Sequence, residues 1–92
     1  MNHVTLFYLE NCPYCIKARK ALAELTEEMP SYREVKIDWV EESLAPDVAG
    51  AYDYYYVPAL FSGEKKLYEA DPSADYEAIK AGIRQALNDV LA

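Results

Sequence analysis

The sequence is poor in the features that mark several classes of protein. Its 92 residues include only two cysteines, one histidine and three glycines, and the net charge is −7. A nucleic-acid-binding surface needs clustered lysine and arginine, whereas the nine basic residues here are scattered. Two cysteines so close in sequence cannot join distant parts of a chain, which excludes a disulfide-stabilised framework.

Long hydrophobic runs are also missing. No stretch approaches the roughly 20 apolar residues of a membrane-spanning helix. The N-terminus has no basic segment followed by an apolar run and a cleavage site, so we expect a cytoplasmic protein without a membrane partner. The length and the 52% hydrophobic content suit a single domain, residues 1–92, which we expect to be a monomer.

Both cysteines belong to one motif, Asn11-Cys12-Pro13-Tyr14-Cys15. This spacing brings two sulfurs onto one helical turn, close enough to form a disulfide or to share a metal. Pro13 suits the first helical position, where no N–H donor is needed, so a helix should begin there. Cys12 then faces unpaired N–H groups and the positive end of the helix dipole, which favour its thiolate. We predict that Cys12 is the reactive sulfur.

The first half of the chain reads as strand, helix and strand. Residues 3–9 predict a short strand covered on both faces, and a helix follows from Pro13 to about Glu28, ended by Pro30. Alternation over residues 31–40 predicts a second strand, joined to the first by a parallel crossover. The apolar positions expected on the helix are Ile16, Ala18, Ala21, Leu22, Leu25 and Met29.

The second half reads as a short helix, a hairpin and a closing helix. Residues 41–54 suit a short or irregular helix, and the apolar run 54–61 leads through a turn into a returning strand at 66–69. A closing helix should begin with Ser73 or Asp75 as its cap.

The first helix carries its charges in an unusual order, with Lys17, Arg19 and Lys20 early and the glutamates late. One interpretation is a solvated face on which Lys20 pairs with Glu24. The other is that the cations favour the Cys12 thiolate and attract an anionic thiol. The sequence leaves both open.

The order of these elements, with Cys-Pro-Tyr-Cys at the first strand-to-helix junction and Val57-Pro58 before the third strand, resembles the glutaredoxins of the thioredoxin superfamily. The resemblance covers nearly the whole chain. It implies an α/β fold in the order βαβ-α-ββ-α, with a four-stranded mixed sheet flanked by helices.

The same resemblance assigns roles to residues. It implies that Cys12 is the attacking thiolate and Cys15 the resolving thiol, and that Pro58 is a cis-proline whose loop lies against the cysteines. Val57 would offer its backbone to an extended peptide. The remaining residues expected to bind substrate are Pro13, Tyr14 and Asp71.

The predicted function is a thiol-disulfide oxidoreductase that reduces protein disulfides, glutathione mixed disulfides or both. Its chemistry needs no metal or organic cofactor, and its reductant would be glutathione or a donor of the thioredoxin-reductase type. A glutathione-independent, thioredoxin-like reductase would use the same residues. The sequence also admits a metal or iron–sulfur site shared by two chains, and a binding module that uses the tyrosines of residues 52–56.

Four positions depart from the pattern of glutaredoxins that bind glutathione. Leu9, followed by the acidic Glu10, stands where a basic residue is usual, and Tyr68 and Glu69 stand where two glycines are usual. We expect Glu10 to repel glutathione, and the Tyr68 and Glu69 side chains to crowd its approach. Asp71 or Asp75 is left to hold its γ-glutamyl end, so binding should be weak.

Overall fold

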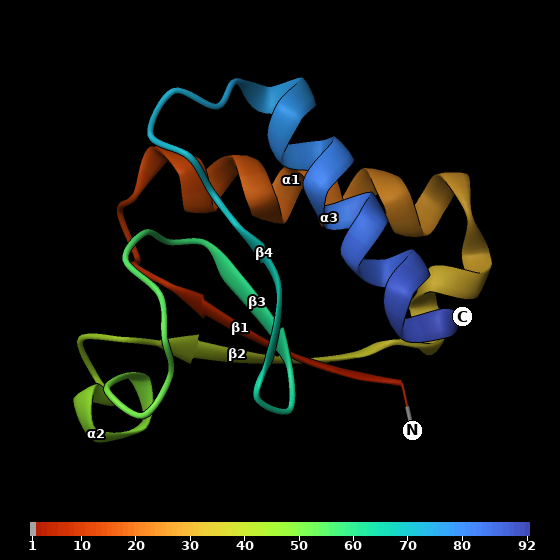
Figure 1. The fold of residues 1–92 in the computed structure, drawn as a ribbon. Helices are drawn as coiled ribbons and strands as arrows, with labels where there is room; N and C mark the ends of the chain where they lie inside the picture. Colours follow the sequence, from red (N-terminus) through yellow and green to blue (C-terminus); the bar gives the residue numbers. More distant parts are fainter. Residues whose placement is uncertain (1) are drawn as a thin grey trace.

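A four-stranded mixed sheet with helices on both faces forms the molecule in a computed structural model that describes residues 2–92 (Figure 1). The predicted order of strands and helices is confirmed. The elements are β1 (His3–Tyr8), α1 (Pro13–Glu28), the 3-10 helix η1 (Pro30–Glu34), β2 (Lys36–Glu41), α2 (Pro46–Ala49), β3 (Ala59–Ser62), β4 (Lys65–Glu69) and α3 (Tyr76–Leu91).

β1 lies inside the sheet, whose strand order is β2-β1-β3-β4. It runs parallel to β2, with Tyr8 opposite Glu41, and antiparallel to β3, with Phe7 opposite Ala59. The last residues of β1 and β2 and the first residues of β3 therefore meet at one edge of the sheet. The cysteine motif follows β1 directly, so it lies at this edge.

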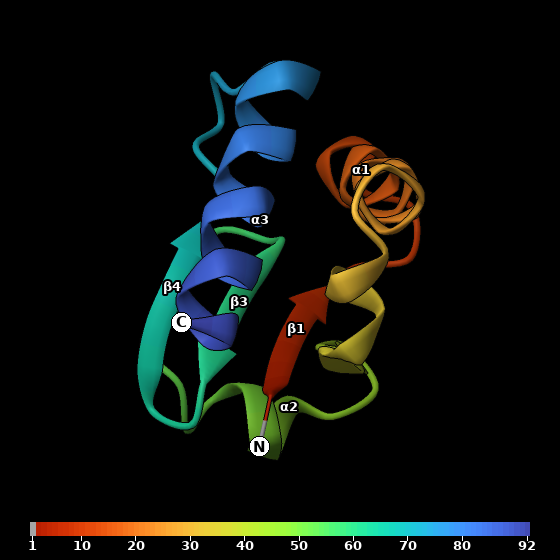
Figure 2. The same cartoon turned by 90° about the vertical axis from the view of Figure 1, so that its right-hand side faces the viewer.

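Alternation along the strands separates two cores. Val4 and Leu6 are fully buried on the face covered by α1 and α3, which lie side by side in Figures 1 and 2. Phe7 points to the opposite face, where it packs with Ala59 and Phe61. Side chains from α2 and from the tyrosine-rich loop after it cover this second core.

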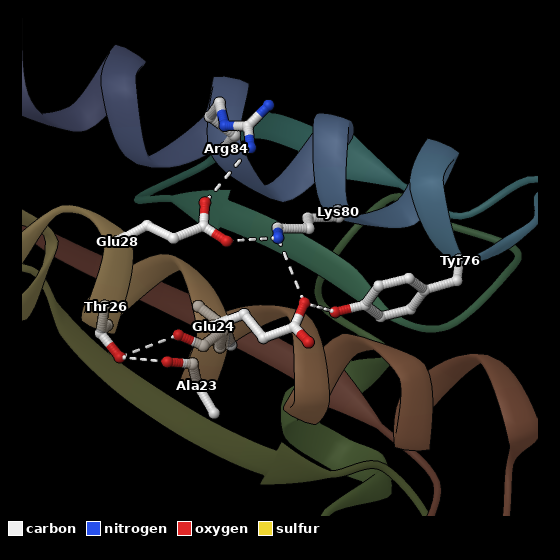
Figure 3. Close-up of polar contacts among 8 residues, drawn as sticks. Ala23, Glu24, Thr26, Glu28, Tyr76, Lys80 and Arg84 are labelled. Atoms are coloured by element: carbon white, nitrogen blue, oxygen red, sulfur yellow. Dashed lines mark hydrogen bonds and ion pairs between the residues drawn. The ribbon is translucent and has the colours of Figure 1, made fainter.

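Polar contacts join α1 to α3 along their exposed side (Figure 3). Glu24 accepts hydrogen bonds from the Tyr76 hydroxyl and from Lys80, whose Nζ lies 3.1 Å away. Lys80 also reaches Glu28 at 2.6 Å, and Arg84 lies 3.7 Å from the same carboxylate. The Tyr76 and Lys80 hydrogen bonds hold the pKa of Glu24 below its usual value. The expected pair of Lys20 with Glu24 is replaced by these contacts with α3.

Two expectations about residues 13–40 are wrong in detail. Residues 30–34 form η1, and the second strand begins only at Lys36. The buried Tyr32 ring turns inward there, and its hydroxyl donates to Asn88 of α3 at 2.7 Å, a contact that sequence alternation cannot predict. Ile16 and Met29 are 57% and 50% exposed. Met29 lies beyond α1 as its extended C-cap, and Ile16 is not among the buried residues of the helix.

The Tyr68 ring fills the space beside Gly82 on α3. A Cβ at Gly82 would lie 2.1 to 2.7 Å from three atoms of that ring. We predict that Gly82→Ala lowers the free energy of unfolding by about 1 kcal/mol or more, because overpacking outweighs the helix propensity that alanine adds. Urea denaturation would measure it.

The matched control is the same substitution in a Tyr68→Ala background. Without the ring, Gly82→Ala should instead stabilise the protein by up to ~1 kcal/mol, the helix-propensity difference. A loss of stability of the same size in both backgrounds would contradict the assigned contact.

Candidate active site

Cys12 lies at the junction of β1 and α1. Its N–H donates to the Leu9 carbonyl at 3.3 Å, and its own carbonyl accepts the Ile16 N–H at 3.0 Å. The residue is extended, with φ −76° and ψ 124°, and serves as the N-cap, while Pro13 begins the helix as predicted. The Cys12 side chain is partly exposed, and both cysteines are free thiols. An accessible sulfur therefore stands at the positive end of α1.

Cys15 lies one helical turn further and is only 2% exposed. Burial raises the pKa of its thiol to about 12, although a hydrogen bond from the Leu9 N–H to its Sγ, 3.4 Å long, acts in the opposite direction. A hydrogen bond with Cys12 and the nearby charge of Glu42 make smaller contributions to the same rise in pKa. At neutral pH Cys15 is therefore a protonated thiol next to an accessible one.

The Val57–Pro58 segment comes to the cysteines through the pairing of β3 with β1. Ala59 lies opposite Phe7, so the two residues before it lie beside the connection from β1 to α1. The Val57–Pro58 peptide bond is cis. Pro58 is buried, and its carbonyl accepts the Ala70 N–H at 3.0 Å.

A small cavity of about 130 Å³ lies next to this segment. The Tyr14 hydroxyl donates to the Pro72 carbonyl at its margin. Three of the residues expected to bind substrate, Tyr14, Val57 and Asp71, line it together, whereas Pro13 and Pro58 do not. The full lining is Tyr14, Tyr56, Val57, Ala70, Asp71 and Pro72.

The sequence reading missed three of these lining residues: Tyr56, Ala70 and Pro72. Each is adjacent in sequence to a predicted site residue, Val57 or Asp71. This adjacency is the sequence feature that could have identified them. Their apolar surfaces make the cavity suitable for an apolar side chain.

The two aspartates left to hold a ligand both have local structural contacts. Asp71 Oδ1 accepts hydrogen bonds from the Ser73 N–H and hydroxyl, at 2.8 and 2.7 Å, and these hold the Asp71 pKa below its usual value. Asp75 caps α3 by accepting the Ala78 N–H at 2.8 Å, which decides between the two expected caps. Of the two, only Asp71 also lines the cavity.

Glu69 has a structural role next to the site that sequence reasoning did not foresee. Its Oε2 atom accepts the N–H groups of Tyr55 and Tyr56, at 2.5 and 2.7 Å, and Lys66 reaches Oε1 at 2.8 Å. Burial opposes ionisation, but these hydrogen bonds outweigh it and lower the Glu69 pKa. Glu69 thus holds the loop before Val57. Neither it nor Tyr68 lines the cavity, and the crowding of glutathione by these two side chains stays a prediction.

Aromatic rings contact the three cations of α1. Arg19 lies between Tyr8 and Trp39, with its guanidinium carbon 4.8 and 4.7 Å from the ring centres. Lys20 lies over Tyr76 at 5.0 Å, and Lys17 over Tyr14 at 5.7 Å. Of these, Lys17 is placed beside the cysteine motif, and cation–π contacts hold the other two against neighbouring elements.

Residues 2–92 lack two further features. They contain no group of three or more histidine, cysteine, aspartate or glutamate side chains that could hold a metal ion. Over the same residues, no helix combines the length and the apolar character needed to cross a membrane.

We predict that iodoacetamide modifies Cys12 at least about tenfold faster than Cys15 between pH 7 and 8.5, because alkylation requires an accessible thiolate. Burial keeps Cys15 protonated over this range. Mass mapping of labelled peptides over a pH series would measure both rates. Equal rates would contradict the difference in environment.

Comparisons with known proteins agree with this geometry. A model of the glutaredoxin family matches residues 4–67, which include both cysteines and Val57-Pro58. No curated protein matches the chain. A solved malarial protein superposes with a TM-score of 0.60 at 16% identity, covering 92% of this chain and 96% of that one.

A second solved structure is thioredoxin 1 from the thermophilic eubacterium Thermosipho africanus. It has a TM-score of 0.60 at 11% identity and covers 98% of this chain and 99% of its own. At such identities the two structures bear on the fold alone, which is that of thioredoxin. The family match spans well over half of the sequence, and the chain therefore belongs to the glutaredoxin family.

Proposed function

We propose that this protein is a dithiol oxidoreductase that reduces protein disulfides, glutathione mixed disulfides or both through Cys12 and Cys15. The observation that carries the proposal is the contrast between the two sulfurs. One is accessible at a helix N-terminus, and the other is buried one turn away with its pKa raised to about 12. That contrast gives the two thiols different roles in thiol–disulfide exchange.

In the first step the Cys12 thiolate attacks a substrate disulfide. A bond forms between Cys12 Sγ and one substrate sulfur, and the other substrate sulfur leaves as a thiolate that takes up a proton. Cys15 stays protonated during this step, so it does not compete for the substrate. No metal or organic cofactor takes part.

In the second step Cys15 attacks Cys12 Sγ. The mixed disulfide has removed the free Cys12 sulfur, whose hydrogen bond and charge both raise the Cys15 pKa, so Cys15 ionises more readily. Its attack forms the Cys12–Cys15 disulfide and releases the second substrate thiol. The substrate gains two electrons and two protons, which the two cysteines lose.

The substrate would lie along the loop before β3. Val57 offers backbone groups to an extended chain beside the cysteines, and the cavity between Tyr14 and Val57 would take a neighbouring side chain. Glu69 supports this surface, because it holds the Tyr55 and Tyr56 amides in place.

The electron donor separates two versions of the proposal. Glutathione reduction is the family pattern, but Leu9 stands in place of a cation and is followed by the acidic Glu10, and Asp71 and Asp75 have contacts within their own turns. These observations favour a second candidate, a glutathione-independent protein reductase. A coupled assay that offers glutathione with its reductase, or thioredoxin reductase, as donor would decide between them.

We predict that Cys12→Ser abolishes disulfide reduction, whereas Cys15→Ser accumulates mixed disulfides with substrate, because only Cys15 can resolve what Cys12 has formed. Non-reducing electrophoresis and intact-mass measurement would detect the trapped species. Equal residual activity in the two variants would show that the assigned roles are wrong.

We also predict that glutathione reduces the oxidised protein with poor saturation, and that Glu10→Lys lowers the glutathione KM by roughly two- to fivefold. The change removes repulsion of an anion at an exposed site, an effect of at most ~1 kcal/mol. Glu27→Lys, an equal charge change at the far end of α1, is the control and should leave the KM unchanged. Saturation of the wild type at low glutathione, with no effect of Glu10→Lys, would contradict this.

A further inference from the structure

Four carboxylates surround the cysteine motif, and we call them the acidic rim: Glu10, Glu41, Glu42 and Asp71. Glu10 is exposed in the same connection as Cys12, and its N–H bonds to the Glu41 carboxylate at the end of β2. The Glu42 N–H donates to the Tyr8 carbonyl at 3.0 Å, and its charge acts on Cys15. Asp71 lines the cavity beside Tyr14.

Lysine and arginine side chains do not neutralise the acidic rim. Within residues 2–92 they form ion pairs with Glu24, Glu28 and Glu69, and none pairs with a rim carboxylate. Lys17 over Tyr14 and Arg19 over Tyr8 are the cations of α1 near this end, two positive charges against four rim carboxylates. In a chain of net charge −7, the rim should make this end of the molecule negative.

Apolar groups lie within the same end of the molecule. The cavity of about 130 Å³ is walled by Tyr14, Tyr56 and Val57. Tyr55 and Tyr56 are 87% and 52% exposed in the loop that Glu69 holds, and Ile16 is 57% exposed one residue after Cys15. A partner that fits this surface needs an apolar side chain next to its sulfur and positive charge around it.

We propose that the preferred substrate is a disulfide in a polypeptide segment that carries lysine or arginine on either side of the cysteine and an apolar residue beside it. This inference rests on the proposed function and names its substrate class. Attraction between the acidic rim and the basic flanks raises the rate of encounter, while the apolar residue enters the cavity. The redox step is unchanged: the peptide disulfide gains two electrons and two protons as Cys12 and Cys15 form a disulfide.

The test uses three synthetic peptides with the same disulfide and the same apolar neighbour, flanked by lysine, glutamine or glutamate. Fully reduced protein, freed of reductant, is mixed with each peptide, and acid-quenched samples are counted for peptide thiol by mass. This single turnover needs no electron donor. At low salt the lysine peptide should react roughly tenfold faster than the glutamine peptide, and the glutamate peptide more slowly still. The difference should shrink to about twofold or less at ~0.5 M salt, where charges are screened.

Variants locate the effect on the rim. Glu10→Gln combined with Glu42→Gln should remove most of the preference, measured within this variant as the ratio of the lysine-peptide rate to the glutamine-peptide rate, because the Glu42 charge also acts on Cys15 and changes both rates alike. Glu27→Gln combined with Glu34→Gln removes the same charge at the far end of α1 and in η1, away from the motif (Figure 1), and should keep the preference.

The outcomes separate the two proposals. If the glutamine peptide is reduced but the three peptides react at equal rates, the substrate inference is overturned and the proposed function stands. The same holds if the far-end control loses the preference as fully as the rim variant does. If no peptide is reduced, the proposed function itself fails, and the inference fails with it.

Discussion

The pairing of β1 with both β2 and β3 is the constraint on which the site depends. One strand, with Val4 and Leu6 buried on one face and Phe7 on the other, fixes where the cysteine motif leaves the sheet and where the Val57–Pro58 segment enters it. Because β3 runs antiparallel to β1, the start of one lies beside the end of the other. Residues more than forty positions apart therefore meet without any direct bond between them being required.

Burial then makes two chemically identical groups different. Cys12 and Cys15 lie one helical turn apart, yet one is accessible and the other is enclosed by the packing of α1 on the sheet. Desolvation of the inner thiol disfavours its ionised form, while the outer one lies partly exposed at the start of the helix. In the mechanism we propose, the order of the two exchange steps follows from this difference in solvation.

Charge is distributed unevenly over the fold. On the helical face, carboxylates of α1 find cations of α3, and these contacts lock the two helices together. Around the motif, the carboxylates have hydrogen bonds within the protein but no cationic partner in residues 2–92. The carboxylates between α1 and α3 are therefore paired within the described part of the protein, whereas those near the cysteine motif are not. A positively charged partner would neutralise the second group.

The sequence by itself determined the order of helices and strands and the start of α1 at Pro13. It also determined which two residues, Cys12 and Cys15, form the candidate reactive pair. These follow from local causes: proline at a first helical turn, hydrophobic periodicity, and a Cys-x-x-Cys spacing that permits few chemistries. The motif together with Val57-Pro58 also indicated the fold. The structure contains these features as the sequence predicts them.

Only the tertiary structure decided how distant side chains are used. Tyr32 turns η1 toward α3, Tyr68 packs on Gly82, and Glu69 holds two amides of the preceding loop. Glu24 forms an ion pair with Lys80 of α3, whereas one interpretation of the sequence paired it with Lys20 of its own helix. The cavity beside Tyr14 needs three separate segments to form. Such contacts depend on which helices, strands and loops become neighbours in the fold. Local sequence patterns do not predict which side chains meet across those neighbours.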